Sequence, residues 1–362
     1  MSTKSDSENI GVRKAKHLEI CVRSDEYAVE TATSLFDQLR FVHRSLPELN
    51  ADAIDTTTAF LGHTVSLPVF ISSMTGGSAE GFRVNKALAR VAQEARIPVG
   101  MGSIRILFTN PDVFPHFHLK ALAPDVPVFA NLGGVQIRDL GHEEIREMVS
   151  RLEVDALVIH LNPGQELFQP EGDRDFQAIL PAIARYCESS PIPVVVKETG
   201  FGIRPGEAKL LLEAGVSYVN VAGAGGTNWV QVEAFRLDRN EQRMAAEFAS
   251  WGTPTAILVA ASSHFAPRIL ASGGLRGGMD VAKSIALGAS LGGLALPFAR
   301  AVYHEGEAGV HALLDSIRRV LVTTMALTGA PNVDALKAVP LWRSPLFAAE
   351  LEAFRHAENG YE

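Results

Sequence analysis

ALVIHLNPGQE, residues 156–166, is the stretch that decides how this sequence folds. Its first half is mostly apolar and does not alternate with polar residues. Such runs are typical of strands buried on both faces of a parallel sheet. Its second half is polar and contains Pro and Gly. The stretch therefore predicts a buried parallel strand whose carboxyl end carries side chains that can bind ligands.

Seven more runs of this kind follow or precede it: LPVFIS (67–72), IPVGMG (97–102), VPVFAN (126–131), IPVVVK (192–197), VSYVNV (216–221), RILASG (268–273) and LGGLAL (291–296). Helical patterns lie between most of them, such as GFRVNKALARVAQEA (81–95) and HEEIREMVSRL (142–152). Eight alternating units predict an α/β fold, a (β/α)8 (TIM) barrel. A doubly wound open sheet is the alternative, but its GxGxxG turn and split strand order are not visible.

The rhythm of strands and helices divides the chain. We expect residues 1–66 to form an N-terminal extension packed on the barrel, residues 67–345 to form the barrel, and residues 346–362 to form a C-terminal tail or helix. Within the extension, SLFDQLRFVH (34–43) has helical spacing. A long gap between the sixth and seventh strands holds an insertion, 228–244, and an apolar helix.

Composition limits the partners. The chain has 362 residues, with 33 Lys and Arg against 41 Asp and Glu, so its net charge is −8. This charge disfavours nucleic-acid binding. No stretch reaches the roughly 18 uninterrupted apolar residues of a membrane span. We expect no secretory signal, and the two cysteines, Cys21 and Cys187, fit a reducing cytoplasm.

Residues able to do chemistry follow nearly every predicted strand, and in barrel enzymes these ends form one rim. Glycine-rich tips at 225–227 and 273–274 allow backbone N–H groups to approach an anion, and phosphate binding is favoured over simple turns. Lys197 ends an apolar strand and needs a partner. That partner is either Glu198 or Glu166 in an internal salt bridge, or an anion such as the N1–C2 edge of a flavin.

Two further groups carry polar chemistry. Gln165 and Glu166 follow His160 and Asn162, and one carboxylate together with substrate phosphates is the usual arrangement around Mg²⁺. Arg13, Lys14 and His17 form a small basic cluster that is either a solvated face or a diphosphate site, and Arg105 could join it.

Taken together, the tips resemble the type 2, FMN-dependent isopentenyl-diphosphate isomerases. The matching pieces are RKAKH (13–17), SMTGG (73–77), GSIR (102–105), ANLG (130–133), HLNPGQELFQPEGDRDF (160–176), VVVKETGFG (194–202), AGAGGTNW (222–229), ASGGLRGGMDVAKSIALGAS (271–290) and ALPF (295–298). They run in order over nearly the whole chain. HLNPGQE with EGDRDF is the most specific, because other FMN barrels share the glycine-rich loops.

The resemblance implies roles for individual residues. FMN would contact Ser73, Met74, Thr75, Ser103, Asn131, Lys197 and Thr227, with its phosphate on Gly273, Gly274, Leu275, Ala295 and Leu296. The substrate diphosphate would meet the extension at Arg13, Lys14 and His17, and the barrel at Ser103, Arg105 and Gln165. Gln165, His160 and Asn162 would be the catalytic residues, and Glu166 would bind Mg²⁺. No role follows for Trp229 or Glu233.

The implied reaction moves the double bond of isopentenyl diphosphate to give dimethylallyl diphosphate, in isoprenoid biosynthesis. Reduced FMN would serve as acid and base, with NADPH as the reductant and Mg²⁺ on the diphosphate. The resemblance also implies a homo-oligomer, a tetramer or an octamer. The nearest alternative is an FMN-dependent α-hydroxy-acid oxidase or dehydrogenase, which requires an H-G-x-R pattern after the sixth strand. This sequence has AGAGGTNW there instead. A nucleotide dehydrogenase would need a nucleophilic Cys in a loop. A non-enzymatic flavin-binding barrel would not need Gln165, Glu166, Arg13 and Lys14 together.

Overall fold

The computed structural model describes residues 4–23 and 26–360. Its helices are α1 (Lys4–Val22), α2 (Ala79–Ala95), α3 (Gly134–Asp139), α4 (His142–Arg151), α5 (Pro163–Phe168), α6 (Ile179–Ser189), α7 (Pro205–Glu213), α8 (Trp229–Ala234), α9 (Arg239–Ala246), α10 (Thr255–Ala261), α11 (Gly278–Ala286), α12 (Leu296–Thr328), α13 (Val333–Lys337) and α14 (Pro345–Asn359). Its strands are β1 (Leu39–Phe41), β2 (Thr58–Phe60), β3 (His63–Val65), β4 (Val69–Ile71), β5 (Val99–Ser103), β6 (Val128–Gly133), β7 (Ala156–Leu161), β8 (Val194–Glu198), β9 (Tyr218–Asn220), β10 (Ile269–Leu270), β11 (Gly292–Leu294) and β12 (Leu341–Arg343).

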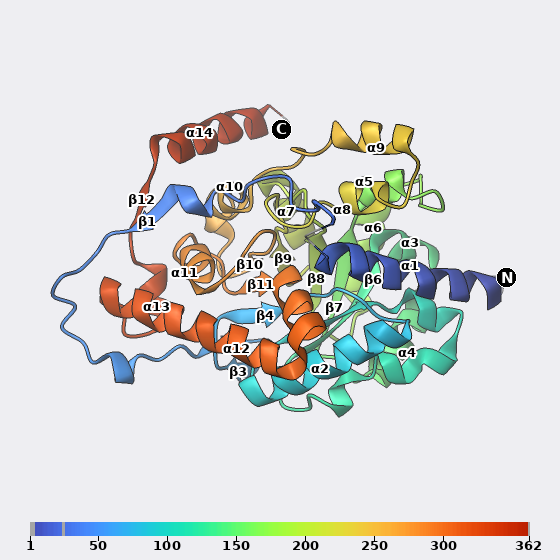
Figure 1. Cartoon of the computed structure of the whole chain (residues 1–362), viewed down its shortest axis with the longest axis horizontal. Helices are drawn as coiled ribbons and strands as arrows, with labels where there is room; N and C mark the ends of the chain where they lie inside the picture. Colours follow the sequence, from blue (N-terminus) through green and yellow to red (C-terminus); the bar gives the residue numbers. More distant parts are fainter. Residues whose placement is uncertain (1–3, 24–25, 361–362) are drawn as a thin grey trace.

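Eight parallel strands form a barrel surrounded by helices (Figure 1). The order is β10-β9-β8-β7-β6-β5-β4-β11. The ends of this order meet because Ala271 pairs with Gly292, and the N–H of Gly293 donates to the carbonyl of Ala271 at 2.7 Å. Each of the eight apolar runs overlaps one of these strands. The predicted (β/α)8 barrel is therefore confirmed.

The interior of the barrel is filled by side chains at alternate strand positions, as the two-residue period of a strand requires. Phe70, Phe129 and Val195 belong to this inner cluster, and the β2–β3 hairpin adds Phe60 to it. Phe60 packs edge-on against Phe129 with ring centroids 6.0 Å apart. Lys197 lies two residues after Val195, so its side chain shares this inward face.

The segments outside the barrel lie on its rim and flank. Helix α1 contacts α2, α8 and α12, and Figure 1 shows it running across the barrel beside α8 and α12. The predicted helix at 34–43 is wrong: a short 3-10 turn, Phe36–Gln38, leads into β1, which pairs antiparallel with β12. The insertion folds into α8 and α9.

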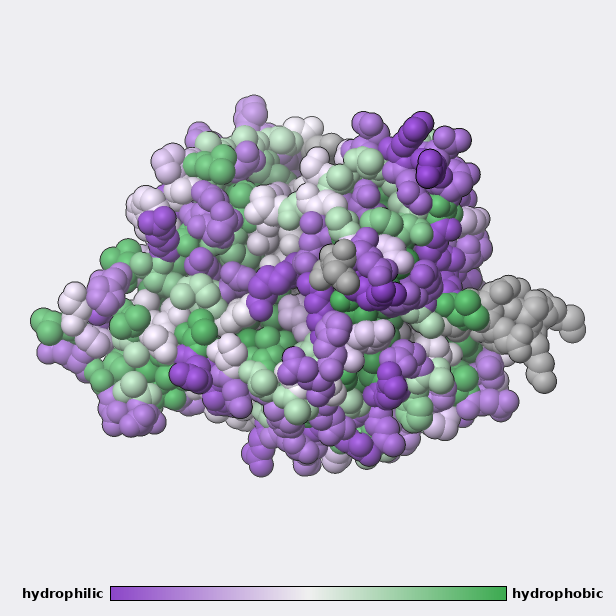
Figure 2. All heavy atoms as spheres, viewed as in Figure 1, coloured by the Kyte–Doolittle hydropathy of each residue, from purple (hydrophilic) through white to green (hydrophobic). Residues whose placement is uncertain are grey.

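The surface shows no single dominant patch on the face in Figure 2, where polar and apolar residues are interspersed. Across the described ranges, we find no helix whose length and hydropathy would let it cross a membrane.

Candidate active site

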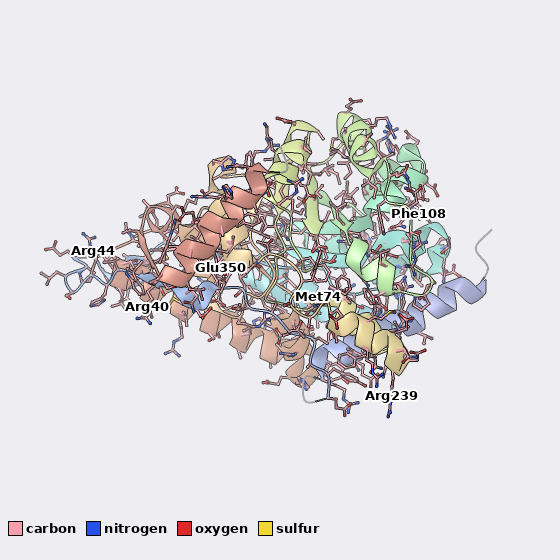
Figure 3. The ribbon with its side chains drawn as sticks, turned by 90° about the horizontal axis from the view of Figure 1, so that it is seen from above. Arg40, Arg44, Met74, Phe108, Arg239 and Glu350 are labelled. Atoms are coloured by element: carbon pink, nitrogen blue, oxygen red, sulfur yellow. The ribbon has the colours of Figure 1, made fainter. Side chains whose placement is uncertain are left out.

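A cavity that is open to solvent, with about 960 Å³ of empty space including its mouth, lies at the carboxyl ends of the barrel strands. Ten of the predicted FMN residues line it: Ser73, Met74, Thr75, Lys197, Thr227, Gly273, Gly274, Leu275, Ala295 and Leu296. They come from the segments after β4, β9, β10 and β11 and from β8. Seen from above, Met74 lies near the middle of the molecule, whereas Arg239 of α9 lies at its edge (Figure 3). The fold therefore brings most of the predicted cofactor residues together.

The glycine pair after β10 is required by the backbone. Gly273 and Gly274 have φ values of +94° and +80°, which side-chain-bearing residues rarely adopt. A Cβ on Gly274 would also lie 2.5 Å from the carbonyl oxygen of Gly225. The two glycine-rich loops therefore pack backbone to backbone, and they leave main-chain groups at the cavity wall.

Lys197 has its own place in the cavity. Burial lowers its pKa to about 8, although the charge of Glu198 opposes this shift. Neither of the salt bridges considered for Lys197, with Glu198 or with Glu166, is present among the described residues. Glu198 instead accepts hydrogen bonds from the N–H groups of Gly200, Phe201 and Gly202, at 2.5, 2.5 and 3.1 Å. Thus Glu198 shapes the loop after β8, and the ammonium of Lys197 is left for a ligand.

The cavity suits an anionic flavin in two respects. The buried ammonium of Lys197 needs a negative or polar partner. The hydroxyl of Thr75 is buried in the cavity wall with no hydrogen-bond partner. Buried polar groups without a partner are costly, and a heterocycle with several hydrogen-bonding atoms would satisfy both.

Helix α1 closes one side of the cavity with the predicted basic residues. Lys14 and His17 line it, and the Lys14 ammonium donates to the backbone carbonyl of Ser103 at 3.0 Å. Burial, followed by the charges of Arg13 and Arg105, lowers the pKa of Lys14 to about 7. Three cations therefore gather at this edge, which is the pattern expected for a polyphosphate ligand.

Both predicted arginines lean towards carboxylates of the loop after α5. Arg13 forms an ion pair with Glu171 at 2.8 Å. Arg105 is half exposed, and its guanidinium lies 3.9 Å from the carboxylate of Asp173. An incoming diphosphate would compete with these carboxylates for the two arginines.

Half-buried His160 and buried Asn131 form a hydrogen-bonded pair beside the cavity. The Nδ1 atom of His160 lies 2.8 Å from Oδ1 of Asn131. Burial and the charges of Lys197, Lys14 and Arg105 lower the pKa of His160 to about 3. The ring is therefore neutral at pH 7, so Nδ1–H donates to Asn131 and Nε2 is a proton acceptor. His160 and Asn162 do not line the first cavity but a second, more apolar one beside α6 and α7.

Sequence reasoning gave no role to Glu233, yet it is the centre of a polar network. It is fully buried in α8. Gln165 donates to it at 2.9 Å, and Nε2 of His17 lies 3.0 Å away. Arg236 pairs with it from the next turn. Burial alone would raise the pKa of Glu233, but these contacts lower it to about 2, so the carboxylate is ionised at pH 7. The available signal was an acidic residue in a helix that is otherwise apolar except for Gln231.

The network extends to the predicted diphosphate side. Arg236 lies 3.7 Å from Glu171, which in turn binds Arg13. His17 also packs edge-on against Trp229, with ring centroids 5.4 Å apart. Trp229, the other residue without a role, is thus a wall of the first cavity.

Glu166 does not belong to a ready-made metal cage. Its two oxygens accept from the Asn162 amide at 2.8 Å and from the N–H of Asp173 at 2.9 Å. No group of three or more His, Cys, Asp or Glu suited to a metal occurs within the described part of the chain. One oriented carboxylate fits Mg²⁺ that takes its remaining ligands from water and from phosphates.

The fold and this cavity define a flavin-binding (β/α)8 barrel, and comparison with known proteins agrees. The model of the FMN-dependent dehydrogenases matches residues 20–107 and 166–343. A flavocytochrome b2 mutant superposes with a TM-score of 0.66 at 19% identity, covering 96% of this chain and 87% of that one. A chimera of (S)-mandelate dehydrogenase gives 0.62 at 19% identity, covering 93% and 99%. These two likenesses establish the fold alone.

Sequence relatives are more specific. An isopentenyl-diphosphate delta-isomerase of Borrelia garinii subsp. bavariensis is 41% identical over 96% of this chain and 97% of its own length. An isopentenyl-diphosphate delta-isomerase of Nostoc sp. is 42% identical over 92% and 96%. This chain belongs to the FMN-dependent, type 2 isopentenyl-diphosphate delta-isomerase family.

Proposed function

We propose that this protein converts isopentenyl diphosphate into dimethylallyl diphosphate by shifting the double bond between neighbouring carbon atoms. One observation carries the proposal: the cofactor loops and the basic residues Lys14 and His17 line the same cavity. The Gln165–Glu233 pair lies beside them. The relatives named as isopentenyl-diphosphate delta-isomerases support this substrate.

The reaction needs a proton added to the terminal carbon of the alkene and a proton removed from the carbon nearer the diphosphate. Reduced FMN, when bound, would supply the acid and base. The protonation states of the protein groups favour this division of labour. Glu233 is ionised and His160 is neutral at pH 7, so neither holds an acidic proton to deliver.

The side chains would then bind and orient. Lys197 would place positive charge beside the flavin, and charge stabilisation of this kind is a large part of catalysis. Glu233 fixes the Gln165 amide, whose oxygen also lies 3.3 Å from the amide nitrogen of Asn162. Gln165 would therefore be held at the alkene end. Arg13, Lys14, His17, Ser103 and Arg105 would hold the diphosphate.

We also propose Glu166 as the protein ligand of Mg²⁺ and NADPH as the source of reducing equivalents. The hydrogen bonds to Asn162 and Asp173 orient the Glu166 carboxylate, which supports its role. Cytoplasmic location and assembly into a tetramer or octamer stay predictions.

The test is an anaerobic assay with isopentenyl diphosphate, Mg²⁺, FMN and NADPH. We expect an acid-labile allylic product that is absent when the flavin stays oxidised. A protein that binds FMN but gives no product would restore the α-hydroxy-acid oxidases as the leading alternative. A protein that neither binds FMN nor turns over would contradict both proposals.

A further inference from the structure

A short segment of the extension, residues 29–34, crosses the rim of the cavity; we call it the strap. The carbonyl of Val29 accepts from the N–H of Asn228 at 2.8 Å, and Glu30 pairs with Thr227 in an antiparallel bridge. The N–H of Ala256 donates to the carbonyl of Ser34 at 3.0 Å. The strap is therefore fixed by its backbone to the loop after β9 and to the start of α10.

The strap places one carboxylate between two arginines. Glu30 forms an ion pair with Arg276, and its other oxygen lies 3.3 Å from the guanidinium of Arg300. All three side chains are largely shielded, with exposed fractions of 27% for Glu30, 39% for Arg276 and 27% for Arg300. In the described ranges, Glu30 is the one carboxylate that forms an ion pair with either guanidinium.

Arg276 belongs to the cofactor cavity as well as to this ion pair. It follows Gly273–Leu275 directly and lines the cavity with them. Its guanidinium also donates to the carbonyl of Gly225 at 3.2 Å, so it spans the two glycine-rich loops. Burial, followed by the nearby charge of Arg300, lowers the pKa of Arg276, and the charge of Asp280 opposes this shift. The ion-pair cluster itself sets two guanidiniums against one carboxylate.

The Glu30 carboxylate and the FMN phosphate would then compete for the guanidinium of Arg276. A phosphate monoester carries about −1.5 to −2 charges at pH 7. If the FMN phosphate lies on Gly273–Leu275, it lies beside a guanidinium already neutralised by Glu30. The carboxylate weakens the pull of Arg276 on the phosphate and also repels the phosphate itself.

We propose that Glu30 is an internal counter-ion that competes with the cofactor phosphate for Arg276, and so limits how strongly the protein prefers FMN over riboflavin. This inference rests on the proposed placement of FMN. It concerns only the phosphate end, because riboflavin has the same ring system and ribityl chain without the phosphate.

The test compares the two ligands on flavin-free, full-length protein. Quenching of flavin fluorescence gives the dissociation constants of FMN and riboflavin at one ionic strength. For Glu30→Gln we expect FMN to bind about fivefold more tightly, since partly exposed charge pairs contribute up to about 1 kcal/mol. Riboflavin affinity should stay within about twofold of the wild type, since it lacks the phosphate charge.

Two variants serve as controls. Glu26→Gln removes a carboxylate that lies just before the strap and pairs with Arg23 instead, and it should leave both affinities unchanged. In an Arg276→Gln background, Glu30→Gln should lose its effect on FMN, because the contested cation is gone. Glu30→Gln could fail to bind riboflavin because it is unfolded. In that case Glu30→Asp, which keeps the charge but moves it away from Arg276, should shift the ratio of FMN to riboflavin affinity in the same direction but less.

Two other results would contradict the proposal. An equal change for both flavins would show that Glu30 only supports the strap. A larger loss for FMN than for riboflavin would show that Glu30 orients Arg276 towards the phosphate. Either result would contradict the proposed competition between Glu30 and the phosphate. Normal FMN binding by the wild type would still support the proposed cofactor site. Failure of the wild type to bind FMN overturns the site and this inference together.

Discussion

Among single residues, Lys14 is expected to link ligand binding to pH. Its pKa of about 7 in the free protein must rise when a diphosphate takes the place of the Ser103 carbonyl, because an opposite charge favours the ammonium. Below pH 7 the ammonium is already present. Above pH 7 binding must take up a proton, so affinity falls with rising pH, by up to about tenfold per unit.

Calorimetry with inorganic diphosphate checks this sign. Titrations at pH 8 in buffers of different ionisation enthalpy should show uptake of about 0.9 proton at Lys14 beyond that of the diphosphate itself. Lys14→Gln removes the residue and should remove this share of the uptake. Equal proton uptake by the wild type and Lys14→Gln would contradict the role.

Glu233 is expected to act through Gln165. Glu233→Gln would replace a charged acceptor by an amide, and charge-assisted hydrogen bonds are about twice as strong as neutral ones. We expect kcat to fall at least about tenfold, as mispositioned groups cause in many enzymes, with FMN affinity unchanged. Glu247→Gln, at an exposed carboxylate just after the insertion, is the control. Unchanged turnover in Glu233→Gln would show that the Gln165 contact is not used.

Glu166 makes a different prediction. Glu166→Gln keeps the hydrogen-bond acceptor for the Asp173 N–H but removes the charge that Mg²⁺ requires. Activity should be lost and should no longer respond to Mg²⁺, while FMN stays bound. A titration of activity against Mg²⁺, run beside a flavin spectrum, measures both. A variant with full Mg²⁺ dependence would assign the metal to other residues.

At the scale of elements, α1 couples the extension to the barrel mouth. Its Leu18 belongs to the main core, and Ile20 packs with Val232 and Leu296. Among the described residues, its side-chain polar contacts to the rest of the molecule at this mouth come, by contrast, from Arg13, Lys14 and His17. A diphosphate bridging these residues to Arg105 would hold the helix more firmly.

We therefore expect diphosphate to slow hydrogen exchange and tryptic cleavage within residues 4–22. Local opening of a terminal element costs less than global unfolding, so added contacts at that element protect it first. The double variant Arg13→Gln with Lys14→Gln should lose the protection. Identical exchange of α1 amides with and without diphosphate in the wild type would refute the coupling.

The local sequence pattern predicts the barrel strands better than it predicts β1 or the role of Glu233. Each barrel strand is a short apolar run that is buried whatever its neighbours are, so the sequence alone indicates it. Strand β1 is different, because Leu39 pairs with Arg343, about three hundred positions away. Its helical spacing was therefore misleading. The rim residues were predictable, since parallel strands end at one edge. Glu233 was not, because its partner Gln165 lies on another βα unit.

At the scale of the whole molecule, the cavity ties the two ends of the barrel sequence together. Its walls come from β8 and β11 and from the segments after β4, β9, β10 and β11, and β4 and β11 are the first and last barrel strands in the chain. Helix α1 adds a sixth side. None of the five βα units that line the cavity can detach without opening it, so a bound cofactor would stabilise these units together.

Flavin binding should therefore raise the global stability rather than that of one loop. A ligand that binds only the folded state contributes about 2.7 kcal/mol at a hundred times its Kd. That corresponds to a rise in Tm of about 5 °C, since each kcal/mol shifts large domains by a few degrees. Calorimetry of the flavin-free protein with and without FMN measures the rise. Exchange of the slowest amides in β4, β8 and β11 should slow by the same free energy, because these amides open only with global unfolding. A rise in Tm with no added protection in β4 would show that the barrel opens in parts.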